Sequence, residues 1–220
     1  MEYLKRREAI SLVVLCNIEP VFVHNRWMLD RSIITHAEFE ESKKRPMTVG
    51  VNVSSFSIGE SMTVYCDKNR FQIESTDVTA YQRIMDICLT TIQMSEPSSI
   101  VALGINSDMD FVFTTEEDAF RFGNEFIPLK QWEGYLNTPR VGAFTIQENH
   151  KASFDNPRRA INIQSLGANK DEKVPNVRIS VNNHYPLSTI DELKQAIGQA
   201  PSQYRAFPEW YDQLFKVTLK

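Results

Sequence analysis

Residues 47–75, MTVGVNVSSFSIGESMTVYCDKNRFQIES, decide the fold class of this chain. Apolar and polar residues alternate through VNVSSF, SMTVYC and RFQIES, which is the period of a strand with one buried face. Gly59 marks a turn after the first run, and Asp67-Lys68-Asn69 marks the turn between the other two. Because strands joined by such short turns pair with their neighbours in sequence, this segment predicts an antiparallel meander.

The segment after the meander predicts an amphipathic helix over 77–94. Thr76 and Asp77 are capping residues at its start, and Glu96-Pro97 ends it. Its apolar residues recur at helical spacing and form one stripe. The stripe consists of Tyr81, Ile84, Met85, Cys88 and Ile92. We expect this stripe to pack against the meander.

The rest of the N-terminal half is less regular. The run ISLVVLC, 10–16, is apolar at nearly every position and predicts a central strand. Residues 21–35, VFVHNRWMLDRSIIT, have mixed strand character, and 36–46, HAEFEESKKRP, form a charged connector. After the long helix, 99–106, SIVALGIN, predict a strand that turns at Ser107-Asp108-Met109 into a partner strand, 110–113.

The C-terminal part alternates between helices and strands. A capping-box spacing from Thr114 to Glu117 predicts a helix over 114–126. Strands are predicted for RVGAFTIQE, RAINIQSL and VRISVNNHY, and two helices follow, one ending at 198–201 and one starting at Pro208.

This order predicts an α+β fold, in which a mainly antiparallel sheet with an N-terminal meander packs with about four helices. A seam near residue 97 divides the chain into a strand-rich half, 1–96, and a half of strands and helices with an aromatic C-terminal helix, 97–220. The two halves form either two subdomains or one continuous domain.

Composition limits the classes of partner. The net charge of −4 disfavours broad nucleic-acid binding, which needs a basic surface. Its local basic spots are Lys43-Lys44-Arg45 and Arg158-Arg159. No apolar run approaches the roughly 20 residues of a membrane helix. Three cysteines without metal-ligand or redox spacing read as buried free thiols, so we expect a cytoplasmic protein.

Asparagine occurs near the end of three aliphatic runs, at Asn52, Asn106 and Asn182. The separations are unequal, 106 − 52 = 54 and 182 − 106 = 76, which argues against an internal duplication. The ordinary explanation is that asparagine suits strand ends. The alternative is that Asn106 and Asn182 end neighbouring strands at one sheet edge, where their amides converge with Asp108, Asp110 and His184.

Asp108 and Asp110 form a candidate metal site. Asp108 and Asp110 are two residues apart, so in an extended segment both project to one face. Such a pair can hold a divalent cation such as Mg²⁺. In this interpretation the chain is a metal-dependent hydrolase or nuclease, in which Glu117 adds a carboxylate and His184 carries protons. The competing interpretation is a polar turn beside a charged helix start, with no cofactor.

Aromatic residues support a different function. Trp132 lies in the short segment WEGYL, and Trp210 and Tyr211 lie in the aromatic C-terminal segment. Aromatic residues are enriched at protein interfaces, although they also pack inside proteins. No nucleotide-binding or nucleophile motif is evident. We therefore expect a non-catalytic protein-binding subunit or accessory component of a larger assembly, binding another protein or a second copy. The alternatives are the metal-dependent enzyme and a nucleic-acid-contacting subunit.

Overall fold

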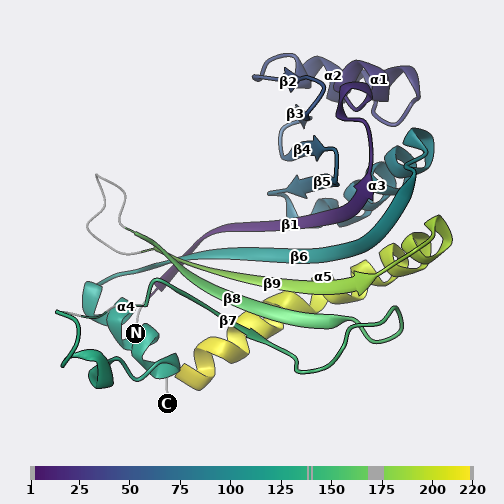
Figure 1. The fold of residues 1–220 in the computed structure, drawn as a ribbon. Helices are drawn as coiled ribbons and strands as arrows, with labels where there is room; N and C mark the ends of the chain where they lie inside the picture. Colours follow the sequence, from purple (N-terminus) through teal and green to yellow (C-terminus); the bar gives the residue numbers. More distant parts are fainter. Residues whose placement is uncertain (1–2, 138, 140, 168–175, 219–220) are drawn as a thin grey trace.

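The computed structural model describes residues 3–137, 139, 141–167 and 176–218. These residues form an antiparallel sheet of nine strands in the order β2-β3-β4-β5-β1-β6-β9-β8-β7 (Figure 1). The strands are β1 (Tyr3–Asn17), β2 (Thr48–Val49), β3 (Val53–Ile58), β4 (Met62–Asp67), β5 (Arg70–Ser75), β6 (Ser99–Phe113), β7 (Ala143–Gln147), β8 (Arg158–Gly167) and β9 (Asn176–Pro186). The α-helices are α1 (Asn25–Asp30), α2 (His36–Ser42), α3 (Tyr81–Ser95), α4 (Glu116–Phe126) and α5 (Ile190–Thr218). The short 3-10 turns are η1 (Pro20–Phe22), η2 (Val78–Ala80) and η3 (Leu129–Trp132). The predicted α+β class is confirmed.

The predicted meander corresponds to β3, β4 and β5. Phe56 pairs with Val64, which pairs with Ile73, and all three are buried. Gly59, in the turn between β3 and β4, has a φ angle of 59°, a left-handed conformation that glycine adopts without steric cost. Turn chemistry and apolar alternation therefore specify the same register here.

The two longest strands, β1 and β6, pair at the centre of the sheet and join the two halves of the chain. The tight turn predicted at 107–109 is wrong, because β6 continues through it to Phe113. Ser107 and Met109 face the buried side, whereas Asp108 and Asp110 face the opposite side. Polar residues at alternate positions are compatible with a strand whose second face is polar.

The segment between β1 and the meander contains η1, α1 and α2, where the sequence predicted mixed strand character and a charged connector. The side chain of His24 accepts a hydrogen bond from the Trp27 amide (3.2 Å) and caps α1. Thr35 and Glu38 form a capping box at the start of α2, with the Glu38 amide donating to Thr35 (3.2 Å). The Thr-x-x-Glu spacing in THAEFEE was the signal for this helix.

Helix α3 buries most of its predicted apolar stripe, although Tyr81 at its start is only partly buried. Ile84, Cys88 and Ile92 are fully buried, in the core that the helix shares with β1 and β5. Arg83 donates to both carboxylate oxygens of Glu38 (2.9 and 2.7 Å), which attaches α3 to α2. Cys16, Cys66 and Cys88 are all buried free thiols.

The two predicted C-terminal helices are one helix, α5, which contains both Pro201 and Pro208. Proline removes a helical hydrogen bond, so each was expected to interrupt the segment. Tertiary packing outweighs this cost, because a continuous row of side chains on one side of α5 is buried against the sheet. The row comprises Leu193, Ala196, Ile197, Ala200, Tyr204, Phe207 and Tyr211.

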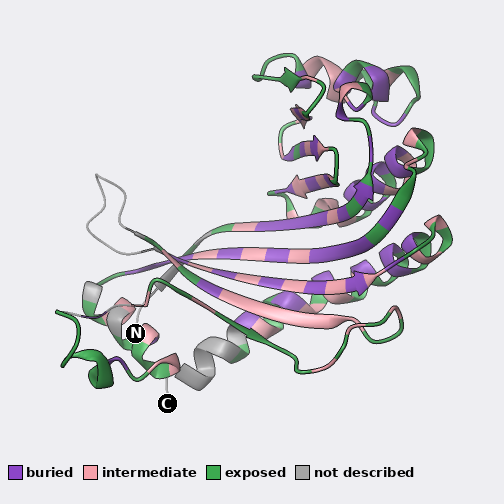
Figure 2. Ribbon diagram, viewed as in Figure 1, coloured by how far each residue is buried: buried purple, intermediate pink, exposed green. Residues whose placement is uncertain are grey.

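The sheet has one covered face and one open, polar face. Helices α3 and α5 pack on the covered face, and the buried residues alternate with half-buried ones along the long strands (Figure 2). The half-buried positions of β6 and β9 carry polar side chains on the opposite side, which we call the polar face. None of the described helices combines the length and apolar character needed to cross a bilayer.

Candidate functional site

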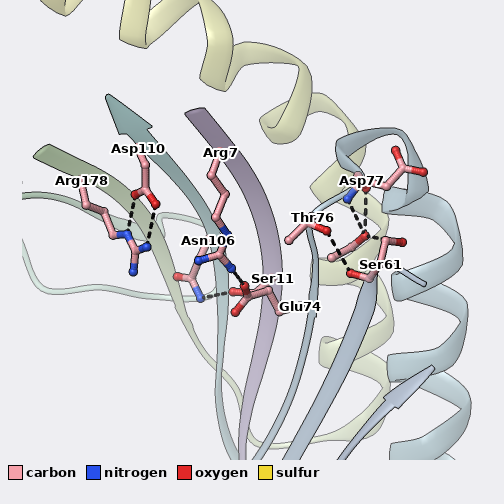
Figure 3. A network of polar contacts seen from close by, with 10 residues as sticks. Arg7, Ser11, Ser61, Glu74, Thr76, Asp77, Asn106, Asp110 and Arg178 are labelled. Carbon is pink, nitrogen blue, oxygen red and sulfur yellow. Dashed lines mark hydrogen bonds and ion pairs between the residues drawn. The ribbon is translucent and has the colours of Figure 1, made fainter. Parts of the chain in front are cut away.

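The polar face brings two of the three asparagines together. Asn106 of β6 and Asn182 of β9 are cross-strand partners, and Nδ2 of Asn182 donates to Oδ1 of Asn106. Nδ2 of Asn106 donates to the Ser11 hydroxyl of β1 at 3.2 Å (Figure 3). Both asparagines lie within strands and not at strand ends, which corrects the predicted sheet-edge position. Asn52 lies outside this cluster, in the exposed loop before β3.

The two predicted metal ligands lie on the same face, but one is already engaged. Nε and Nη2 of Arg178 donate to the two carboxylate oxygens of Asp110 at 2.7 and 2.9 Å (Figure 3). Asp110 holds the pKa of Arg178 above its ordinary value by accepting these bonds. Asp108 pairs across the strands with Ser180. A carboxylate held by a bidentate arginine is neutralised and poorly placed to bind Mg²⁺.

His184 lies on the polar face, beside Gly104 of β6 and Arg158 of β8. Burial lowers the pKa of His184 below its ordinary value, and the positive charge of Arg158 lowers it further. Gly104 and Asp108 are separated along β6 by about 13 Å, at the usual rise per strand residue. Because His184 pairs with Gly104, it lies at about this distance from Asp108. This is too far for direct proton exchange with a ligand held by Asp108.

Glu117, the third carboxylate of the enzyme hypothesis, does not join the polar face. It is exposed in the first turn of α4, which starts beyond the end of β6. Among the described residues, no three His, Cys, Asp or Glu side chains are grouped so that they could hold a metal ion. Among the residues that the structure describes, Glu117 and His184 therefore do not converge with Asp108 and Asp110.

A second candidate surface is the turn that follows α4. Trp132, Tyr135 and Leu136 expose 50%, 84% and 54% of their surface, and we call them the aromatic turn. The amides of Tyr135 and Leu136 both donate to the Trp132 carbonyl (2.9 and 2.8 Å), which closes the turn. At its base, Leu129 is buried, and its amide donates to Oδ1 of Asn124 at 3.0 Å. Three apolar side chains are therefore presented on an anchored turn.

The other two predicted interface residues pack inside the chain. Tyr211 is only 1% exposed, and its hydroxyl donates to the Ser107 carbonyl at 2.9 Å. Trp210 is half-buried beneath Arg159, whose guanidinium lies 3.6 Å from the ring centroid. Nε of Arg159 also donates to Oδ1 of Asn183 at 3.1 Å. Both aromatics hold α5 to the sheet, so Trp132 is the predicted residue that remains available to a partner.

The two basic spots do not merge into one surface. Lys43 and Lys44 directly follow α2 and form ion pairs with Glu40 and Glu41 (2.7 and 2.5 Å). Arg158 and Arg159 start β8, near the opposite end of the strand order from β3, on which α2 packs (Figure 1). Paired and separated charges of this kind give little support to a nucleic-acid track.

Two features escaped the sequence analysis. Arg178 was not recognised as the partner of Asp110, because the pairing depends on the register of β6 with β9. The other feature is Phe22, which is 60% exposed, although the apolar residues around it predicted strand character. Phe22 lines a groove of about 510 Å³ between η1, α1 and the end of α3. Trp27, Arg31 and Met94 also line it.

Comparison with known proteins identifies no family. No protein-family model matches the chain, and no curated protein matches it. Among solved structures, the aspartate kinase of Clostridium acetobutylicum is similar over 93% of this chain, with 14% sequence identity and a TM-score of 0.27. The chain spans about a third of the kinase's length (34%). A TM-score this low does not establish a common fold.

Proposed function

We propose that this chain is a non-catalytic protein-binding subunit that contacts its partner through the aromatic turn, Trp132, Tyr135 and Leu136. The main observation in its support is that these three apolar side chains are exposed together on one closed turn. Tryptophan and tyrosine provide large contact areas and dominate the energetics of many protein interfaces.

The anchoring of the turn supports this proposal. Binding costs less conformational entropy when the contact residues are already held in place. Here the turn is closed by hydrogen bonds to the Trp132 carbonyl, and its base is fixed by buried Leu129. Glu133 and Lys130, both exposed, provide a polar rim of mixed charge. An apolar centre with a polar rim is the usual anatomy of a protein interface.

The polar face gives less support to the enzyme alternative. Asp110 is bound by Arg178, and His184 lies about 13 Å along the sheet from Asp108, by strand geometry. A general acid or base must reach the reacting group within hydrogen-bond distance. At this separation, His184 and Asp108 do not both reach the same substrate atom within hydrogen-bond distance.

Affinity capture from the native host tests the proposal. Wild-type protein and the Trp132→Ala variant are immobilised, together with Phe22→Ala, which removes a similarly exposed aromatic ring from η1. We expect one protein to be captured by the wild type and Phe22→Ala but not by Trp132→Ala. Its affinity, measured by calorimetry with the purified partner, should fall about 30-fold or more in Trp132→Ala. If all three baits capture the same proteins with equal affinity, the aromatic turn is not the binding surface.

A further inference from the structure

Strand β7 is the last strand of the sheet that the described residues form, and most of its residues are exposed. Ala143, Thr145, Ile146 and Gln147 are exposed, and only Phe144 is half-buried. Edge strands usually carry protection such as charged residues, proline, a bulge or very short length. The sequence AFTIQ has no charge and no proline, and its pairing with β8 runs without a register shift.

The hydrogen bonds that flank β7 show which backbone groups point outward. The Glu148 amide donates to the Arg159 carbonyl (3.0 Å), and the Ser165 amide donates to the Gly142 carbonyl (2.8 Å). In an antiparallel pair every second residue exchanges such bonds with its partner. Phe144 and Ile146 therefore bond to β8. The N–H and C=O groups of Ala143, Thr145 and Gln147 point away from the sheet.

The chemistry of these outward positions fits a second copy of the same strand. The strand is uncharged, so a symmetric contact brings no like charges together. Thr145 lies midway between Ala143 and Gln147, so a two-fold axis at Thr145 pairs every outward residue with another outward residue. The opposite edge of the sheet, β2 (Thr48–Val49), is too short to form a comparable ladder.

We propose that two copies of this chain associate through antiparallel pairing of β7 with β7 about a two-fold axis at Thr145, which makes one continuous sheet. Thr145 pairs with its own counterpart, and Ala143 pairs with Gln147 of the second copy. A two-fold interface of this kind is closed, so the product is a dimer and not a filament. This contact is separate from the aromatic turn of the proposed function.

The same register covers exposed apolar surface. Ile146 lies on the covered side of the sheet with Ile161 and Val181 but is 54% exposed, since β7 ends the strand order of the described part of the chain. About the axis at Thr145, Ile146 of one copy lies opposite Phe144 of the other. Phe144 already contacts Phe126, with ring centroids 5.4 Å apart. Aromatic and β-branched residues form favourable cross-strand pairs, so the dimer extends the existing core.

Charge reversal at the axis tests this inference with the full chain. Sedimentation equilibrium should show a concentration-dependent dimer for the wild type. Thr145→Lys and Thr145→Glu each place like charges opposite each other, and each should raise the dimer dissociation constant about tenfold or more. An equimolar mixture of the two variants should restore dimerisation, because the opposite charges then meet across the axis.

Two controls separate the interface from the fold. Thr145→Val removes the hydrogen bond from Nδ2 of Asn162 (2.8 Å) without adding charge and should leave the dimer intact. Thr63→Lys adds the same charge at an exposed position of β4 and should also leave it intact. Hydrogen exchange at the Thr145 amide should slow as protein concentration rises, while exchange at Ile146 should not. A monomer at all concentrations, a larger open-ended assembly, or a dimer unaffected by Thr145→Lys would overturn the proposal.

Discussion

Asn182 donates a hydrogen bond from Nδ2 to Oδ1 of Asn106, directly across β9 and β6. Nδ2 of Asn106 in turn donates a hydrogen bond to the Ser11 hydroxyl at 3.2 Å. These three side chains connect the central strands on the polar face. They are satisfied by one another, so the cluster is best understood as a structural connection between strands.

Asn106→Ala should therefore reduce stability, because it removes the middle of the cluster and both of its hydrogen bonds. We expect the free energy of unfolding to fall by about 1–2 kcal/mol, the usual value for such partly buried bonds. Asn52→Ala is the matched control, since Asn52 is exposed in a loop, and it should change stability by less than about 0.5 kcal/mol. Urea unfolding measures both. Equal losses for the two variants would show that the cluster adds no stability.

The asparagine pattern shows how far the sequence carries such a prediction. The proximity of Asn106 to Asn182 was one of two hypotheses that followed from the aliphatic runs before them. Their placement at strand ends was wrong, because asparagine was taken as a turn residue. The strand β6 runs on through Asp110, and its polar residues occupy the open face. Propensity describes single residues, whereas the register of the sheet decides where they lie.

The helices show the same contrast between local sequence preference and tertiary packing. Helix α3 was predictable because its apolar spacing and its capping residues agree. Helix α5 was predicted as two helices because Pro201 and Pro208 weigh against a continuous helix locally, and only burial against the sheet offsets them. Helix α2 was missed, although its capping box was present at Thr35 and Glu38. The aromatic turn could be suspected from WEGYL, but exposure of Trp132 and burial of Tyr211 required the tertiary structure.

Asp110→Asn should destabilise the protein more than Asp108→Asn. The Asp110 carboxylate holds Arg178 in a bidentate, partly buried ion pair, and its loss leaves that guanidinium without its counter-charge. We expect a loss of about 1–2 kcal/mol for Asp110→Asn, discounted for partial exposure. Thermal melts with millimolar Mg²⁺ complete the experiment. A rise in Tm with Mg²⁺ that disappears in Asp108→Asn would instead revive the metal site.

His184 should make stability depend on pH in a defined direction. Its pKa is lowered in the folded state by burial and by Arg158, so the unfolded chain takes up this proton at higher pH. The stabilising contribution is complete above the unfolded pKa, about 6.5 for histidine, and is lost as the pH falls below that value. Burial also lowers the pKa of His24, which acts in the same sense.

Arg158→Ala tests the cause of this shift. Removing the adjacent positive charge should raise the pKa of His184 toward its ordinary value, as measured by the NMR titration of its ring protons. Arg31→Ala removes a charge just after the end of α1 and serves as the control, for which the pKa of His184 should not change. An unaltered titration in Arg158→Ala would mean that burial alone sets the value.

Ile84→Ala measures how much the contact between α3 and the sheet contributes. Ile84 is fully buried, so truncation removes apolar contacts and leaves a cavity. We expect a loss of about 2–5 kcal/mol in the free energy of unfolding. Gln93→Ala, on the exposed side of the same helix, should change it by less than about 0.5 kcal/mol. A loss within experimental error for Ile84→Ala would contradict the buried position of this face.

Substitution of Trp210 should lower the stability of the protein, whereas substitution of Trp132 should lower its binding to a partner. Trp210 packs beneath Arg159 of β8 and lies 5.5 Å from the Phe207 ring of its own helix, so Trp210→Ala removes the Arg159 contact that holds α5 to the sheet. We expect its free energy of unfolding to fall by about 2 kcal/mol, because both the cation–π contact and buried apolar area are lost. Trp132 is half-exposed, and Trp132→Ala should leave stability within about 0.5 kcal/mol of wild type while abolishing partner capture. Denaturant unfolding of both variants separates these effects. If Trp132→Ala is instead the destabilising variant, the aromatic turn serves the fold of the chain and not the binding of a partner.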